Sequence, residues 1–441
     1  MAKPDKDAAQ RALSAAEARF VANNPRSKSL HEQAAQALPG GNTRTVLYTS
    51  PFPLSMKQGK GAYVWDEDGH KYLDLVGELS AGLYGHSHPL IRETLLSTFD
   101  SAGVSLGAST AHEQAFAELL CARFRLARVR MTNSGTEANL HAFAGARHFT
   151  GRRKVVVFSG GYHGGVLSFP DGRPAANVVD QADFVVAPRY NDVASAVETI
   201  SAVGDLAAVL VEPVQGAGGC IPATREFLMA VRDAARAKGA LFILDEVMTS
   251  RLAPGGLGVE MGLEPDLVTL GKYLGGGLAF GAFGGRENVM ALYDPRIEGG
   301  LAHSGTFNNN TLVMATGRAA LERIYTPEVC EDFNRSADEF RRKLSSLSKG
   351  TRLCFTGCGS LIGFHFTDDV RDEVLCGEDI NGKERKDLRD LFWFEMLEAG
   401  FWTVRRGYIA LILETSEAEL NAFVEAVRAF LNRHHDIMLV A

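Results

Sequence analysis

The chain has 441 residues, of which 46% are hydrophobic and 22% charged, and a formal net charge of −7 at pH 7. This length exceeds an ordinary domain of roughly 100–200 residues, so we expect two domains or one large domain with an added lobe. The composition is that of a globular protein with a large core, and its slightly acidic charge gives no reason to expect nucleic acid or an acidic membrane as a partner.

The first part of the chain, residues 1–75, is predicted to be an N-terminal segment that belongs to a small lobe. Its polar, acid-bearing first seven residues do not resemble a signal sequence or a transit peptide. No apolar stretch reaches the ~18 residues of a membrane span, so we expect a cytoplasmic protein without a membrane partner. An amphipathic helix is predicted around residues 8–22, and a small hairpin over residues 61–74, turned at Asp68-Gly69.

Between about residues 115 and 290, short apolar runs alternate with helical patterns. This alternation is typical of βαβ units and predicts an α/β fold with a mostly parallel, seven-stranded sheet. We expect this sheet in a large domain over residues 76–320, followed by a small α+β domain over residues 321–441. The predicted strands are 129–132, 155–158, 184–187, 208–212, 241–245, 267–270 and 280–284.

The C-terminal part ends in a helix with a clear start signal. Ser416 and Glu419 have the spacing of a capping box, and apolar residues follow at helical spacing from Leu420 to Leu431. The six cysteines of the chain are scattered, which favours a reducing compartment over a secreted disulfide scaffold. Cys354 and Cys358 lack a second Cys/His pair at zinc-site spacing, so no metal is expected.

Two of the predicted strands end in side chains of opposite charge. Asp245 closes one strand and Lys272 follows another, and ligands of open α/β folds bind at the carboxyl ends of the strands. Pyridoxal phosphate needs such a pair: a lysine holds its aldehyde as a Schiff base, and a carboxylate keeps its ring nitrogen protonated. Taken alone, however, an acid after a strand is more often a turn or cap residue, and a lysine near glycines is usually solvated.

Other segments supply further groups that this cofactor would require. Ser134-Gly135-Thr136 begin a helical pattern after a strand, where backbone N–H groups can bind an anion, although Ser134 and Glu137 also match a purely structural capping box. Tyr162 lies in a glycine-rich turn and could stack on a flat ligand or pack in the core. Val211 to Gly216 end another strand with polar groups that could contact a ring hydroxyl, or form only a strand end.

In combination, these segments resemble the class III aminotransferases, which are fold-type-I pyridoxal phosphate enzymes. The resemblance extends from about residue 35 to the end of the chain. The motifs that carry it, in the family's order, are N-S-G-T-E-A at 133–138, G-Y-H-G at 161–164, V-E-P-V-Q-G at 211–216, D-E-V at 245–247, T-L-G-K at 269–272 and H-S-G-T-F at 303–307.

The resemblance implies a role for each matching residue. Lys272 would form the Schiff base and then move a proton, and Asp245 would pair with the pyridine nitrogen. Thr306 would reach the phosphate of the neighbouring subunit, which requires a homodimer with shared active sites. The other implied cofactor contacts are Ser134, Gly135 and Thr136 at the phosphate, Tyr162 on the ring, and Glu212 and Gln215 at the hydroxyl edge.

Within this family, the chain most resembles the β-phenylalanine or β-amino-acid aminotransferases, and next the glutamate-1-semialdehyde aminomutases. The strings behind this are residues 158–165, D-E-V-M-T-S-R-L-A-P at 245–254 and G-A-F-G-G at 281–285. Aminomutases share D-E-V-M-T but usually continue with Gly-Phe, which this chain lacks.

Substrate carboxylates are expected to bind two arginines. Arg44 and Arg406 match positions at which the β-amino-acid enzymes bind carboxylates, and a planar guanidinium suits a bidentate grip; Arg405 is taken as an ordinary surface arginine. The resemblance thus implies a transaminase that moves the amino group of a β-amino acid, with an aromatic or bulky side chain, to 2-oxoglutarate or pyruvate. The alternatives are an intramolecular aminomutase, another ω-amino acid or amine transaminase, and a cofactor-binding or purely structural protein that has lost activity.

Overall fold

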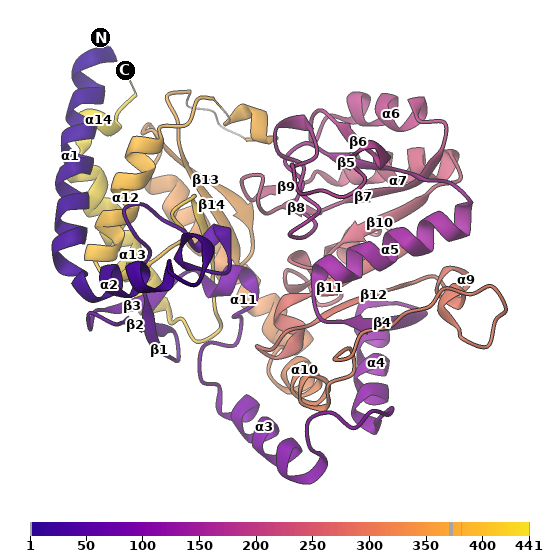
Figure 1. Ribbon diagram of the computed structural model, residues 1–441. Coiled ribbons are helices and arrows are strands. Elements are labelled where there is room, and N and C mark those ends of the chain that lie inside the picture. Colours follow the sequence, from indigo (N-terminus) through magenta and orange to yellow (C-terminus); the bar gives the residue numbers. More distant parts are fainter. Residues whose placement is uncertain (1, 370–373, 381, 441) are drawn as a thin grey trace.

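The computed structural model describes residues 2–369, 374–380 and 382–440. Figure 1 shows two halves side by side. One half contains a seven-stranded sheet, and the other combines the two ends of the chain, which lie near each other at its top. This is the predicted α/β fold with a smaller α+β lobe.

The large sheet consists of β4 (Arg128–Thr132), β5 (Lys154–Phe158), β6 (Phe184–Ala187), β7 (Leu206–Val211), β10 (Leu241–Asp245), β11 (Leu267–Gly271) and β12 (Gly281–Gly285). The strand order is β4-β12-β11-β10-β7-β5-β6. The pairs from β6 to β11 are parallel, whereas β12 is antiparallel to both β11 and β4. The prediction of a mostly parallel, seven-stranded sheet is confirmed.

The helices of the large half are α3 (Pro89–Ala102), α4 (Ala111–Phe124), α5 (Gly135–Thr150), α6 (Val193–Ala202), α7 (Arg225–Ala237), α8 (Gly256–Glu260), α9 (Glu287–Met290) and α10 (Thr311–Arg323). Both faces of the sheet are buried. Val155 and Val157 pack in one hydrophobic cluster with α5, whereas Val156 and Phe158 pack in another with α7. Successive side chains of a strand point to opposite faces, so burial on both faces produces the continuous apolar runs in the sequence.

The smaller half contains α1 (Ala2–Asn23), α2 (Pro25–Ala34), β1 (Met56–Lys60), β2 (Tyr63–Asp66), β3 (Lys71–Asp74), α11 (Pro327–Leu347), β13 (Leu353–Cys358), β14 (Leu361–Phe366), α12 (Lys386–Glu398), β15 (Phe401–Trp402), β16 (Tyr408–Ala410), α13 (Glu417–Arg433) and α14 (His435–Met438). Strands β2 and β3 form the predicted hairpin, and Ser416 and Glu419 form the predicted capping box of α13. Strand β15 pairs in parallel with β3, which joins the two ends of the chain in one sheet.

One hydrophobic core includes apolar residues from positions 9–75 and from positions 337–438. For example, Phe20 of α1 packs on Trp393 and Phe394 of α12, with ring centroids 5.8 and 5.2 Å apart. The shared core supports the assignment of the N-terminal segment to the small lobe. The boundaries at residues 75 and 320 stay a prediction.

The described part of the chain contains no membrane-spanning helix, no cluster of metal ligands and no disulfide bond. None of its helices combines the length and the apolar character needed to span a membrane. Among these residues, no cluster of three or more His, Cys, Asp or Glu side chains could hold a metal ion. The cysteines at positions 121, 220, 330, 354, 358 and 376 are all free thiols.

Candidate active site

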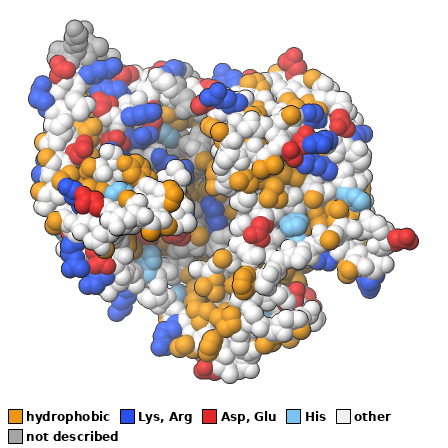
Figure 2. All heavy atoms as spheres, viewed as in Figure 1, with side chains coloured by type: hydrophobic (Ala, Val, Ile, Leu, Met, Phe, Trp, Pro, Cys, Tyr) orange, Lys and Arg blue, Asp and Glu red, His pale blue; other side chains and the backbone are white. Residues whose placement is uncertain are grey.

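A cavity of about 520 Å³ lies between the two halves, where Figure 2 shows the surface to be hollowed. Strands β4, β5, β7, β10 and β11 all run in the same direction, so the segments that follow them meet at one edge of the sheet. Nine of the predicted site residues line this cavity: Arg44, Ser134, Gly135, Thr136, Tyr162, Glu212, Asp245, Lys272 and Arg406.

Lys272 directly follows β11, and its side chain reaches the turn Gly77–Ser80, which lies against β16 of the smaller half. Its Nζ donates hydrogen bonds to the carbonyl oxygen of Leu79, at 2.7 Å, and to Oγ of Ser80, at 3.1 Å. Burial lowers the pKa of the Lys272 amine to about 8, against the attraction of the Asp245 and Glu212 carboxylates. Near neutral pH a useful fraction of this amine is therefore uncharged and able to accept a proton.

Asp245 ends β10, the neighbour of β11, and is only 5% exposed. Its Oδ2 accepts a hydrogen bond from Nδ2 of Asn139 at 2.9 Å and lies 2.7 Å from Nδ1 of His163. Oδ1 accepts from the backbone N–H of Val247 at 3.0 Å. These contacts fix the orientation of the carboxylate, and a buried carboxylate held in this way can stabilise a cation placed against it.

Asn139 and His163 are site residues that sequence reasoning missed. His163 stands inside the G-Y-H-G motif, and Asn139 is a polar residue on the buried face of α5, where Oγ of Thr269 also donates to its Oδ1 at 2.9 Å. A polar residue at a core position of an amphipathic helix was the available signal, because buried polar groups need partners. Neither the G-Y-H-G motif nor the buried polar position on α5 predicts that the partner is Asp245.

Glu212 and Gln215, three positions apart, point in different directions. Glu212 lines the cavity, accepts hydrogen bonds from the N–H groups of Tyr162 and Gly216 at 3.0 and 3.2 Å, and has its pKa raised to about 7 by burial. Gln215 is not among the lining residues; its Nε2 donates to the carbonyl oxygen of Ser159 at 2.9 Å. The structure thus places Gln215 beneath the turn that carries Tyr162.

The start of α5 is capped by Ser134 and also faces the cavity, so it can both begin the helix and bind an anion. Oγ of Ser134 accepts from the N–H of Glu137 at 3.2 Å, so Ser134 is the N-cap of the helix. Ser134, Gly135 and Thr136 also line the cavity. Since the first N–H groups of a helix have no acceptor within it, this helix start can bind an anion such as a phosphate.

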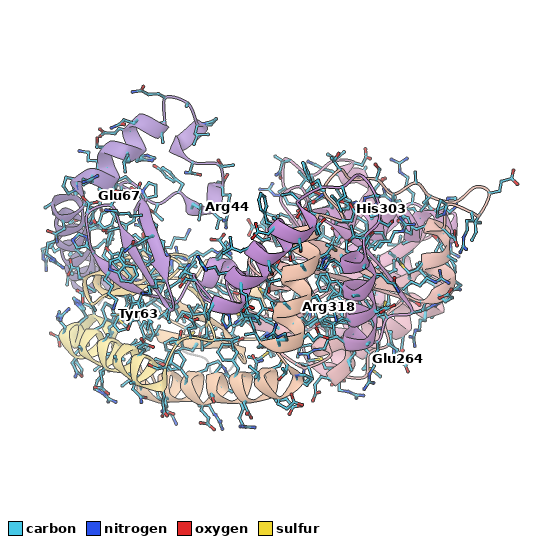
Figure 3. The ribbon with its side chains drawn as sticks, turned by 90° about the horizontal axis from the view of Figure 1, so that it is seen from below. Arg44, Tyr63, Glu67, Glu264, His303 and Arg318 are labelled. Carbon is cyan, nitrogen blue, oxygen red and sulfur yellow. The ribbon has the colours of Figure 1, made fainter. Side chains whose placement is uncertain are left out.

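The three arginines considered from the sequence lie in different surroundings. Arg44 lines the cavity and forms an ion pair with Glu78, and Figure 3 shows it on the smaller half, facing the space between the halves. Arg406 also lines the cavity, and no residue of the described chain forms an ion pair or a hydrogen bond with its side chain. Arg405 is bound to Asp390, with its Nε 3.0 Å from Oδ1, and it covers the ring of Phe394.

Thr306 does not line this cavity; it lies exposed in the loop before α10. His303, three residues earlier, lies far from Arg44 in Figure 3. Two residues after Thr306, Oδ1 of Asn308 accepts a hydrogen bond from Nδ2 of Asn133 at 2.9 Å, so this loop lies next to the start of α5.

The cavity fits pyridoxal phosphate in the chemistry of its groups. Lys272 supplies a primary amine for the aldehyde, Asp245 a buried carboxylate for the ring nitrogen, and the start of α5 an anion site for the phosphate. The fold and these groups define a fold-type-I enzyme that depends on pyridoxal phosphate.

Comparison with known proteins gives the family. The sequence matches the description "Aminotransferase class-III" over residues 47–431, and the chain belongs to this family of pyridoxal phosphate-dependent transaminases. It is 47% identical to a beta-phenylalanine transaminase of Variovorax paradoxus over 431 residues, which are 97% of each protein.

Solved structures agree with this assignment. The crystal structure of a beta-phenylalanine aminotransferase from Variovorax paradoxus superimposes with a TM-score of 0.94 at 46% identity, covering 98% of this chain and 100% of the other. A glutamate-1-semialdehyde aminomutase from Pseudomonas aeruginosa superimposes with a TM-score of 0.87 at 24% identity, covering 97% and 98%. At that identity the likeness to the aminomutase shows a common fold.

Proposed function

We propose that this enzyme transfers the amino group of a β-amino acid, with an aromatic or bulky side chain, to 2-oxoglutarate or pyruvate. The observation that carries the proposal is that Lys272 and Asp245, at the ends of two neighbouring strands, face one cavity with two arginines. The 47% identity to a beta-phenylalanine transaminase supports the β-amino acid as the donor.

Each residue of the cavity has a distinct task in this proposal. When bound, pyridoxal phosphate supplies a conjugated ring that accepts the electron pair released as a C–H bond of the substrate breaks. Lys272 would hold the cofactor, and its Nζ would take a proton from the substrate and return it to another carbon. Asp245 would pair with the ring nitrogen, and Tyr162, Glu212 and the start of α5 would position the ring and its phosphate.

The two arginines account for substrate recognition. A transaminase must hold the carboxylate of the amino donor and that of the oxo acid in turn, and Arg44 and Arg406 are the arginines that line the cavity. Guanidinium groups bind carboxylates in a bidentate manner. The remaining wall is suited to an apolar side chain of the donor, since it includes Val46, Leu79, Met248, Leu278 and Phe280.

The proposal includes a homodimer, in which Thr306 reaches the phosphate site of the partner subunit. Next to Thr306, Phe307 is 59% exposed, and Phe99 and Leu106 are 57% and 56% exposed. The backbone N–H of Thr311 bonds to the carbonyl oxygen of Val104, which brings these segments together, and hydrophobic side chains gather in the lower part of Figure 2. An exposed apolar patch of this kind indicates a protein interface. The six free cysteines suit a reducing compartment, so we place the dimer in the cytoplasm.

The purified enzyme is expected to be yellow, because the bound aldehyde form of the cofactor absorbs visible light. Addition of a β-amino acid should bleach it, and an oxo acid should restore the colour, as followed by absorbance. A protein that stays colourless after incubation with pyridoxal phosphate would instead support an inactive, purely structural protein.

A panel of α-, β- and ω-amino acids and simple amines, tested against pyruvate and 2-oxoglutarate, determines the donor and the acceptor. We expect the fastest bleaching with β-amino acids that have bulky side chains, and product formation only when an oxo acid is present. Turnover of a single substrate without an added oxo acid would favour an intramolecular aminomutase.

Replacing Arg406 by alanine should raise KM for carboxylated substrates about 10- to 100-fold and leave simple amines unaffected, since it removes a charge-assisted hydrogen-bond donor from the cavity. Steady-state kinetics on both kinds of substrate provide the measurement. Arg405→Ala is the matched control, because Arg405 is bound to Asp390 outside the cavity. Equal losses for acids and amines in Arg406→Ala would refute the assigned role.

A further inference from the structure

Three consecutive residues at the edge of the cavity have a left-handed backbone. Glu78, Leu79 and Ser80 have φ angles of 47°, 53° and 78°, and the preceding Gly77 has a φ of 49°. This conformation is unfavourable for residues with a side chain, and it persists only where the surrounding structure imposes it. Such strain clusters at functional sites.

A buried arginine holds this turn in place. Arg251 is 0% exposed and donates from Nη1 to the carbonyl oxygen of Ser80 at 3.2 Å, from Nε to Oγ of Ser360 at 3.1 Å, and from Nη2 to the carbonyl oxygen of Leu411. In the described part of the chain no carboxylate forms an ion pair with it. Burying a cation without a counter-ion is costly, so its bonds to backbone and hydroxyl oxygens are what keep it there.

The turn presents two oxygen atoms to the catalytic lysine. The carbonyl oxygen of Leu79 and Oγ of Ser80 accept the two hydrogen bonds of Lys272 Nζ, at 2.7 and 3.1 Å. Lys272 itself has a left-handed backbone, with a φ of 55°. Both partners of this contact are thus held in unusual conformations, and they come from positions 193 and 192 residues away in the sequence.

We propose that Ser80, together with the carbonyl oxygen of Leu79, is the docking site of the free Lys272 amine during turnover, and that Arg251 keeps this site in position. Ser80 is therefore a positioning residue for the proton transfer. The inference rests on the proposed role of Lys272, and it deepens that role by naming what holds the base.

The need for such a site follows from the lysine side chain. Its flexible four-carbon stem allows many rotamers once the amine is released from the cofactor. A proton transfer requires the acceptor nitrogen within hydrogen-bond reach of the substrate proton. The two fixed acceptors, the carbonyl oxygen of Leu79 and Oγ of Ser80, restrict the Lys272 side chain to rotamers that hold its amine in one place. This restriction lowers the entropic cost of each proton transfer.

The variant Ser80→Ala tests this assignment, because it removes the hydroxyl and keeps Cβ and the backbone. We expect kcat to fall about 10-fold with KM changed less than about two-fold, since positioning and not substrate binding is lost. The kinetic isotope effect for a donor deuterated at the carbon that bears the amino group should increase, because proton transfer becomes slower relative to the other steps.

A second measurement probes the amine directly. In holoenzyme bleached with the amino donor, Lys272 is free, and its acetylation by acetic anhydride can be followed by peptide mass spectrometry. Loss of an acceptor that stabilises the ammonium form lowers its pKa, so Ser80→Ala should be acetylated about 3- to 10-fold faster at pH 7. The other charged groups that act on Lys272 are Asp245, Glu212, Arg406 and Arg251, and they are unchanged in this variant.

Ser348→Ala is the matched control, since it removes a buried hydroxyl that donates to the carbonyl oxygen of Ser345 and contacts neither Lys272 nor Arg251. It should leave the acetylation rate and the isotope effect as in the wild type. Unchanged acetylation and isotope effect in Ser80→Ala, or the same changes in both variants, would overturn the inference. Failure of the proposed function is seen separately, as an active and coloured Lys272→Ala variant.

Discussion

Replacing Lys272 by alanine is expected to reduce kcat by at least about 1,000-fold. The variant loses the amine that holds the cofactor and the base that moves the proton, and general acid–base catalysis alone contributes about 100- to 10,000-fold. The folded structure should persist, because the two hydrogen bonds of Nζ go to Leu79 and Ser80 at the wall of a cavity that water can enter. Initial rates with a β-amino acid and 2-oxoglutarate provide the measurement.

Lys238→Ala is a suitable control for this change. Lys238 follows α7 at the surface, and its Nζ donates only to the carbonyl oxygen of Ser201. It should keep the wild-type rate and colour. A Lys272→Ala enzyme that retains a tenth or more of the wild-type kcat would contradict the assignment of Lys272.

Asp245→Asn is the second change with a large expected effect, a fall in kcat of about 100- to 1,000-fold. A carboxylate about 4 Å from a cationic ring nitrogen attracts it by roughly 4 kcal/mol at an effective dielectric constant near 20, which corresponds to about a 1,000-fold effect if all of it is realised in the transition state. Asparagine keeps the shape of the side chain, and its one oxygen can accept either from Nδ2 of Asn139, as Oδ2 does now, or from the N–H of Val247, as Oδ1 does. The variant should bind the cofactor, seen by absorbance, and turn over slowly.

Glu246→Gln is the control that distinguishes the effect of the charge of Asp245 from that of a structural disturbance at the end of β10. Glu246 is buried next to Asp245, but it faces away from the cavity and accepts the N–H groups of Leu257 and Gly258 at 2.8 and 2.7 Å. We expect a lower melting temperature and a nearly unchanged kcat. If Glu246→Gln lost as much activity as Asp245→Asn, the specific role of Asp245 would be refuted.

Local features of the fold were predictable from the sequence. The seven strands of the large sheet, the hairpin of β2 and β3 and the capping box at Ser416 all follow from patterns within a few residues. The pairing of β15 with β3 was not predictable, because β15 has two residues and its partner lies more than 300 positions away in the sequence.

At the site, the sequence indicated which residues stand at the strand ends, but not all of their directions. It placed Asp245, Lys272 and Glu212 at one edge, because parallel strands bring their carboxyl ends together. It also predicted Gln215 near the cofactor, which stays a prediction; in the structure Nε2 of Gln215 donates to the carbonyl oxygen of Ser159. Gln215 stands in the short strand β8 (Val214–Gln215), three positions after Glu212, and the direction of its amide depends on the packing of this strand.

The sequence by itself determined the family, the cofactor and the residues with charges suited to it, because those signals are short and stand in a fixed order. The tertiary structure decided which groups hold these charges in place: His163 and Asn139 at Asp245, and Leu79 and Ser80 at Lys272. These partners lie 82 to 193 positions apart in the chain. Such contacts form only when the tertiary structure packs together, so local sequence patterns do not predict them.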